Sequence, residues 1–185
     1  MPLTVIDPAT ALIIVDLQKG VASLVNAQAF DPVVRHAREL AETFRSRGLP
    51  VVLVNVAGGA PGRTEHARGL ANLPADWTEL LPQLDPQPTD HRVTKRTWGA
   101  FTHTDLEAYL RSLSVTQVVL AGVATSIGVE STARQAHELG FHVTLAIDAM
   151  TDLSPEAHHN SLTRIFPRLG ETGTTAQVLE LLRRQ

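Results

Sequence analysis

Four short apolar runs constrain the fold of this chain more than any other feature of the sequence. They lie at residues 11–15, 50–56, 117–123 and 142–148, and β-branched residues are frequent in all four. The runs are continuous rather than alternating in polarity, which is typical of strands buried on both faces. A weaker candidate strand lies at residues 91–94. We therefore predict a parallel sheet inside an α/β domain.

Amphipathic stretches separate the apolar runs and are predicted to form helices. Asp31, Thr104 and Ser154 are candidate N-caps, and Gly48 and Gly140 are candidate C-terminal stops. Short links between strands and helices imply right-handed crossovers, so we expect helices on both faces of the sheet. The expected helices lie at residues 31–47, 105–113, 127–139, from 155 onward, and 176–184.

The composition favours one soluble domain. The chain has 185 residues, 43% hydrophobic and 19% charged, which is sufficient for a full core. The formal net charge of −3 argues against a nucleic-acid partner, because neutralising phosphates requires a basic surplus. The sequence has neither an apolar run of membrane-spanning length nor the pattern of a secretion signal. We expect a cytoplasmic protein without a membrane partner.

Cysteine is absent from the sequence, and this limits the chemistry. A count of zero excludes disulfides, thiolate metal sites and a cysteine nucleophile. The segment at residues 122–128 follows an apolar run but has neither the spacing of a Walker loop nor that of a dinucleotide fingerprint. Nucleotide binding therefore has no motif to support it.

Polar groups follow three of the predicted strands. Asp16 directly follows the first run, Lys95 follows the weak strand, and residues 122–128 lead from the third run into a helix. Ligands of open α/β sheets bind beyond the carboxyl ends of the strands, where these groups are expected to meet. A carboxylate beside an ammonium can transfer protons, and a strand-to-helix turn can bind an anion. The alternatives remain a structural turn residue for Asp16 and a surface charge for Lys95.

Three segments together resemble the isochorismatase-like superfamily of hydrolases. They read IIVDLQ, VTKRTWGAF and VVLAGVATSIGVESTARQAHELGFHVTLAIDA, and the similarity extends over nearly the whole chain. The resemblance implies a single domain over residues 1–185, folded as a three-layer, Rossmann-like α/β sandwich. Its six-stranded, mostly parallel sheet would have helices on both faces, and residues 171–174 would supply the sixth strand.

The resemblance also implies roles for individual residues. Most members of the superfamily are cysteine hydrolases that act on amides with an Asp–Lys–Cys triad. Asp16 matches the aspartate that handles the proton, and Lys95 matches the lysine that keeps this aspartate ionised. The position of the cysteine falls on Gly128, which has no nucleophile, so the covalent route is closed.

Isochorismatases proper resemble this arrangement, with glycine at the nucleophile position, and they hydrolyse a vinyl ether with release of pyruvate. We therefore predict acid-catalysed, non-covalent hydrolysis of a small carboxylated metabolite by Asp16 and Lys95, with the Asp16 pKa raised by burial. The residues around Gly128 look more like the amidase branch, so two alternatives stay open. One is a small-molecule-binding or regulatory protein that descends from a cysteine amidohydrolase. The other is an amidohydrolase that uses activated water.

Further parts of the substrate site follow from the resemblance. It implies a cis peptide bond between Val123 and Ala124 and an oxyanion pocket formed by backbone amides near Ile127 and Gly128. A carboxylated substrate would need a cationic partner. The cationic candidates are Arg63, Arg68, Arg96 and, more weakly, His66, and the candidates for an apolar wall are Trp77, Trp98 and Phe101.

No cofactor is expected, and the expected assembly is a homodimer or homotetramer. Nicotinamidase relatives bind a metal with an aspartate and two histidines after the second strand. The corresponding region here contains only His66 and, later, His91, without an Asp-x-His cluster. We therefore predict no catalytic metal. Members of the superfamily commonly form dimers or tetramers, and a small-molecule substrate is the expected partner.

Overall fold

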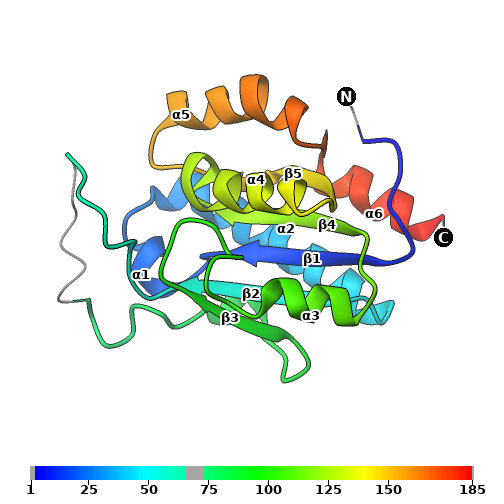
Figure 1. The fold of residues 1–185 in the computed structure, drawn as a ribbon, viewed down its shortest axis with the longest axis horizontal. Coiled ribbons are helices and arrows are strands. Elements are labelled where there is room, and N and C mark those ends of the chain that lie inside the picture. Colours follow the sequence, from blue (N-terminus) through cyan, green and yellow to red (C-terminus); the bar gives the residue numbers. More distant parts are fainter. Residues whose placement is uncertain (1–2, 66–72, 185) are drawn as a thin grey trace.

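The computed structural model describes residues 3–65 and 73–184 and contains one six-stranded sheet. All strand pairs are parallel, in the order β3-β2-β1-β4-β5-β6, so β1 and β4 lie at the centre (Figure 1). The strands are β1 Thr10–Val15, β2 Val51–Val56, β3 His91–Lys95, β4 Gln117–Val123, β5 His142–Thr151 and β6 Glu171–Gly173. The predicted α/β fold is confirmed, with a sheet that is parallel throughout.

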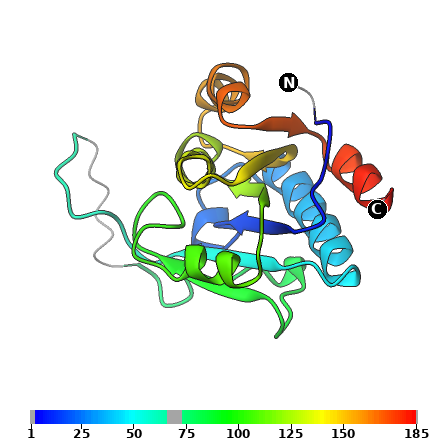
Figure 2. The same cartoon turned by 45° about the vertical axis from the view of Figure 1, so that its right-hand side comes forward.

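Helices cover both faces of the sheet and make a three-layer molecule (Figure 2). Helices α2 and α6 share a hydrophobic core with one face of the sheet, and α3 and α4 share a second core with the other face. The α-helices are α1 Lys19–Ala22, α2 Ala27–Ser46, α3 Leu106–Ser112, α4 Glu130–Glu138, α5 Pro155–Asn160 and α6 Thr175–Arg183. Short 3-10 turns lie at Pro82–Leu84 and Phe166–Arg168, and π turns lie at Thr125–Val129 and Ser161–Ile165.

The continuous apolar character of β1 follows from its place between two cores. Leu12 and Ile14 belong to the core under α2, whereas Ile13 and Val15 belong to the core under α3 and α4. Successive side chains of a strand point to opposite faces, so apolar side chains are needed on both faces of a strand that is covered on both sides. All four side chains are at most 1% exposed.

Most predicted helix ends are close to those observed. Helix α3 begins one residue later than predicted, after Asp105, and Thr104 accepts only a long hydrogen bond of 3.4 Å from the Leu106 amide. Asp31 does not cap α2, because the helix begins one turn earlier, where Asn26 accepts a hydrogen bond of 2.9 Å from the Gln28 amide. The earlier start buries Phe30 against the sheet. Ser154 caps α5 as predicted, by accepting a hydrogen bond from the Ala157 amide.

Glycine ends two of the predicted helices as expected. Gly48 follows α2 with a φ of +67°, and Gly140 follows α4 with a φ of +83°. Only glycine adopts this left-handed conformation without a steric penalty, so the chain turns sharply at both positions. Helix α4 itself begins later than predicted, at Glu130, because residues Thr125–Val129 form a wider π turn.

Candidate active site

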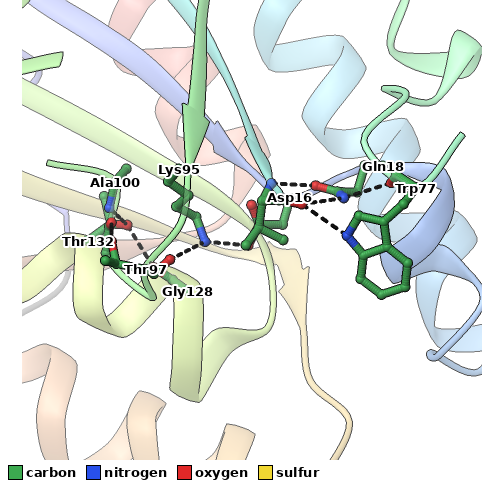
Figure 3. Close-up of polar contacts among 10 residues, drawn as sticks. Asp16, Gln18, Trp77, Lys95, Thr97, Ala100, Gly128 and Thr132 are labelled. Atoms are coloured by element: carbon green, nitrogen blue, oxygen red, sulfur yellow. Dashed lines mark hydrogen bonds and ion pairs between the residues drawn. The ribbon is translucent and has the colours of Figure 1, made fainter. Parts of the chain in front are cut away.

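A buried ion pair joins two strand ends on one edge of the sheet. Lys95 Nζ donates a hydrogen bond of 2.7 Å to Asp16 Oδ2, and these residues are 2% and 5% exposed (Figure 3). Lys95 ends β3 and Asp16 follows β1, so the lysine side chain reaches across the end of β2. The backbone of Asp16 has a φ of +54°, and its amide donates to Val54 O.

The environment of Asp16 keeps its carboxyl protonated to a higher pH than that of an exposed aspartate. Burial raises the pKa of Asp16 from 3.8 to about 6, although the charge and hydrogen bond of Lys95 act in the opposite direction. Lys95 contacts only one carboxylate oxygen. Asp16 Oδ1 is buried and has no hydrogen-bond partner among the described residues. Because a buried polar oxygen normally has a partner, Oδ1 is the atom available to a ligand.

The turn that leads into α4 lies directly against this acid. A Cβ atom added at Gly128 would lie 3.1 Å from Asp16 Oδ2, 3.1 Å from Val15 Cγ1 and 3.3 Å from Val123 O. These separations are tighter than ordinary van der Waals contacts. A side chain at residue 128 would therefore have to displace the carboxylate or its neighbours.

A small cavity opens beside the ion pair. Its volume is about 190 Å³. The lining residues are Asp16, Val56, Gly58, Gly59, Trp77, Lys95, Thr97, Trp98 and Ile127. Trp98 is 62% exposed, which places it at the mouth of the cavity. A larger hollow of about 580 Å³ is lined by Thr10, Val51 and Val115, at the amino ends of the strands or in the segments before them, away from the buried acid.

Gln18 holds one wall of the cavity and was not predicted from the sequence. Its side chain accepts from the Val56 amide at 2.7 Å and donates to Val56 O at 3.0 Å and to Trp77 O at 2.7 Å. Trp77 Nε1 also donates to Val56 O (Figure 3). Gln18 is fully buried, and its position two residues after Asp16 was the only signal in the sequence.

Two predictions for the turn after β4 meet different outcomes. The peptide bond between Val123 and Ala124 is cis, and both residues lie in the chain just before the π turn, outside the cavity lining. Ile127 is among the lining residues, but its backbone amide donates to Ala124 O at 3.1 Å. This amide is occupied within the turn, so the structure does not support it as an oxyanion donor.

The structure separates the remaining substrate-binding candidates. Phe101 does not line the cavity: its ring packs on Phe141, with 6.0 Å between ring centroids, because the chain has turned away toward α4. Arg63 is exposed and is not among the lining residues. Arg96 lies closer, since its guanidinium donates to Ala57 O at 3.1 Å and packs over Gly58 of the lining.

Two candidates, His66 and Arg68, lie outside the described residues. Within residues 3–65 and 73–184, no group of three or more histidine, cysteine, aspartate or glutamate residues could hold a metal ion. The absence of a catalytic metal therefore stays a prediction.

The fold and the site define an α/β protein with a buried acid–lysine pair at the carboxyl edge of a parallel sheet, where ligands of such sheets bind. The model of the isochorismatase domain matches residues 10–177, and the chain therefore belongs to the isochorismatase family of hydrolases. No helix in the described part of the chain is long and apolar enough to cross a membrane.

Similar proteins cover almost the whole chain. The isochorismatase family protein YwoC of Bacillus subtilis (strain 168) is 44% identical over 178 residues, which cover 92% of this chain and 93% of that protein. A structure of an isochorismatase family protein from Burkholderia thailandensis has a TM-score of 0.92 and 41% identity, and covers 97% and 98% of the two chains. The ureidoacrylate amidohydrolase RutB of Pseudomonas syringae pv. syringae (strain B728a) is 28% identical over 185 residues, which cover 84% and 76%.

Proposed function

We propose that this protein hydrolyses a small carboxylated enol ether, with Asp16 as general acid and no covalent intermediate. The observation that carries the proposal is the buried carboxyl of Asp16, whose pKa lies at about 6 and whose Oδ1 atom has no partner among the described residues. A general acid works best when its pKa lies near the operating pH. The sequence has no cysteine to form a thioester.

The reaction needs one proton donor and one water molecule. Protonated Asp16 transfers its proton to the terminal carbon of the vinyl group, and the ether carbon becomes an oxocarbenium ion. Water adds to that carbon and returns one proton to the Asp16 carboxylate. The resulting hemiketal breaks its bond to the ether oxygen, which leaves as an alcohol with the hydroxyl proton, and a keto acid remains. Lys95 stabilises the carboxylate that exists between the two proton transfers.

Gly128 supports the role of Asp16 as general acid, because a residue without a side chain leaves space beside the carboxyl group. A Cβ atom at this position would lie 3.1 Å from Asp16 Oδ2, so the glycine lets the acid approach the turn closely. The nucleophile position of the superfamily, which the resemblance places at Gly128, would then hold no reacting side chain. Water is the nucleophile in this proposal.

The test is hydrolysis of isochorismate and of simpler enolpyruvyl ethers, followed by mass spectrometry of pyruvate. In D₂O, transfer of the acid proton to carbon should introduce one deuterium into the methyl group of pyruvate. Asp16→Asn should reduce turnover strongly, whereas Asp31→Asn, at an exposed aspartate, should not change it. Absence of turnover with every enol ether, or full activity of Asp16→Asn, would rule out the proposal.

A second candidate is a binding or regulatory protein that descends from a cysteine amidohydrolase. The 28% identity to a ureidoacrylate amidohydrolase favours a cavity shaped for amides. Stabilisation by amides or carboxylates in a thermal-shift screen, together with inertness in every hydrolase assay, would support this function. Amidase or thioesterase activity of Gly128→Cys would show that the rest of the amidase machinery is present.

An amidohydrolase that activates water directly is the third candidate. Hydrolysis of an amide in ¹⁸O-labelled water would place one label in the acid product, and it would occur in the unmodified protein rather than only in Gly128→Cys. Cytoplasmic location and assembly as a homodimer or homotetramer complete the proposal. Light scattering of the purified protein tests the assembly, and cell fractionation tests the location.

A further inference from the structure

The segment at residues 97–102 follows β3 and lies on helix α4, where two polar side chains bind it. We propose that Thr132 and Gln135 are positioning residues that hold this segment, and through it Lys95, beside Asp16. The consequence for catalysis rests on the function proposed above, whereas the consequence for the ion pair does not.

Thr132 joins the segment to the turn that contains Gly128. Its hydroxyl accepts a hydrogen bond of 3.1 Å from the Ala100 amide and donates one of 2.7 Å to Gly128 O (Figure 3). The amide can only donate and the carbonyl can only accept, so one hydroxyl serves both without conflict. Thr132 is fully buried, and water does not compete for either bond.

Gln135 binds the same segment one helical turn later. Residues three positions apart share one face of a helix, so Gln135 lies beside Thr132. Its Oε1 accepts from the Phe101 amide at 3.0 Å, and its Nε2 donates to Thr102 Oγ1 at 2.6 Å. A Cβ atom at Gly99 would lie 2.1 Å from Gln135 Oε1, so the glycine allows the backbone to lie flat against the carboxamide.

The held segment carries the second hydrogen-bond acceptor of the lysine. Lys95 Nζ donates to Asp16 Oδ2 and also to Thr97 O, at 3.2 Å. The pairing of β3 with β2 ends at Lys95, opposite Val56. The sheet therefore does not fix Thr97, and the contacts with α4 supply the constraint. Strand β3 is separated from β4 by two strands, so these contacts are also a direct link between Lys95 and the turn at Gly128.

The test is an NMR titration of the Asp16 carboxyl carbon in the full-length, ¹³C-labelled protein, assigned with Asp16→Asn. Lys95 lowers the pKa of Asp16, so Thr132→Val, which removes both hydrogen bonds of Thr132, should raise it by about half a unit or more. Thr132→Ser retains the hydroxyl and should restore the original pKa. Thr144→Val is the matched control, because Thr144 is a buried threonine near the amino end of β5, where its hydroxyl accepts a hydrogen bond from Gln117 of β4.

An unchanged Asp16 pKa in folded Thr132→Val would overturn the proposal, as would an equal shift in Thr132→Ser or Thr144→Val. If circular dichroism shows that Thr132→Val does not fold, Gln135→Met replaces it in the titration. The Asp16 pKa of Gln135→Met should then rise by about half a unit or more, and an unchanged pKa would overturn the proposal. The titration needs no substrate. Failure of enol ether hydrolysis would therefore reject the proposed function alone, and an unchanged pKa in an active protein would reject only the positioning role.

Discussion

The Lys95 ammonium and the Asp16 carboxylate lie 79 positions apart in the sequence, and a hydrogen bond of 2.7 Å joins them in the interior of the protein. Only one carboxylate oxygen takes part in this bond, and the other has no partner among the described residues. Lys95 therefore offsets part of the rise in the pKa of Asp16 that burial causes, and it leaves Oδ1 free to contact a ligand.

Replacement of Asp16 by asparagine should remove the proton donor and keep the shape of the side chain. Because general acid catalysis typically contributes about 10² to 10⁴ in rate, kcat/KM for an enol ether should fall by about this factor. The measurement is steady-state kinetics at pH 6. A decrease in kcat/KM of less than about fivefold would place the acid elsewhere.

The activity should depend on pH through the protonated form of Asp16. With a pKa of about 6, the rate should be constant below that pH and fall about tenfold per unit above it. The profile of kcat/KM between pH 4.5 and 8.5 measures this limb. A rate that rises through the same range would mean that the carboxylate, acting as a base, is the active form.

The free energy of unfolding should also depend on pH, because the Asp16 carboxyl ionises at a different pH in the folded and unfolded states. The pKa of Asp16 is raised from 3.8 to about 6 in the folded protein, so the folded state binds more protons than the unfolded state in this window. The contribution of Asp16 to the free energy of unfolding is therefore full below about pH 4 and is lost as pH rises to about 6. The loss is about 3 kcal/mol from the size of the shift. Urea unfolding of the natural protein and of Asp16→Asn should show this slope only in the former.

Gly128→Ala tests the close approach of the turn to the acid. The added Cβ would lie 3.1 Å from Asp16 Oδ2, so we expect activity to fall at least about tenfold as the carboxylate moves. Stability should change by less than about 1 kcal/mol, because the better helix propensity of alanine offsets the overpacking. Gly62→Ala is the control, since a Cβ there meets nothing within 4 Å. Full activity of Gly128→Ala would show that the space at this position is not needed.

Trp98→Ala tests the mouth of the cavity. The side chain is 62% exposed, so its removal should change the free energy of unfolding by less than about 0.5 kcal/mol. Loss of an aromatic wall should raise KM by about three- to tenfold with a smaller effect on kcat. Leu113→Ala removes another exposed apolar side chain, 46% exposed and away from the site, and should leave KM unchanged.

Local features that depend on neighbouring residues were predictable from the sequence. The apolar runs around Leu12 and Val119 require burial on both faces, and the order of strands and helices follows from them. The sequence correctly predicted that Asp16 and Lys95 lie at strand ends. A charged residue at the end of an apolar run indicates where the strand leaves the core. Asn26 was missed as the cap of α2, since several residues near a helix start can cap it, and burial of Phe30 selects one.

Contacts between distant segments were decided only by the tertiary structure. Trp98 and Phe101 are both aromatic and lie three residues apart, but of the two only Trp98 lines the cavity. Gln135 binds the Phe101 amide, and this contact holds Phe101 against α4. The amide of Ile127 is likewise occupied by a carbonyl within its own turn. The sequence by itself determined which side chains can perform acid chemistry and at which strand ends they lie. The strand order and the packing of the connecting segments decided which of them meet, since such contacts depend on many distant residues together and leave no periodic signal along the chain.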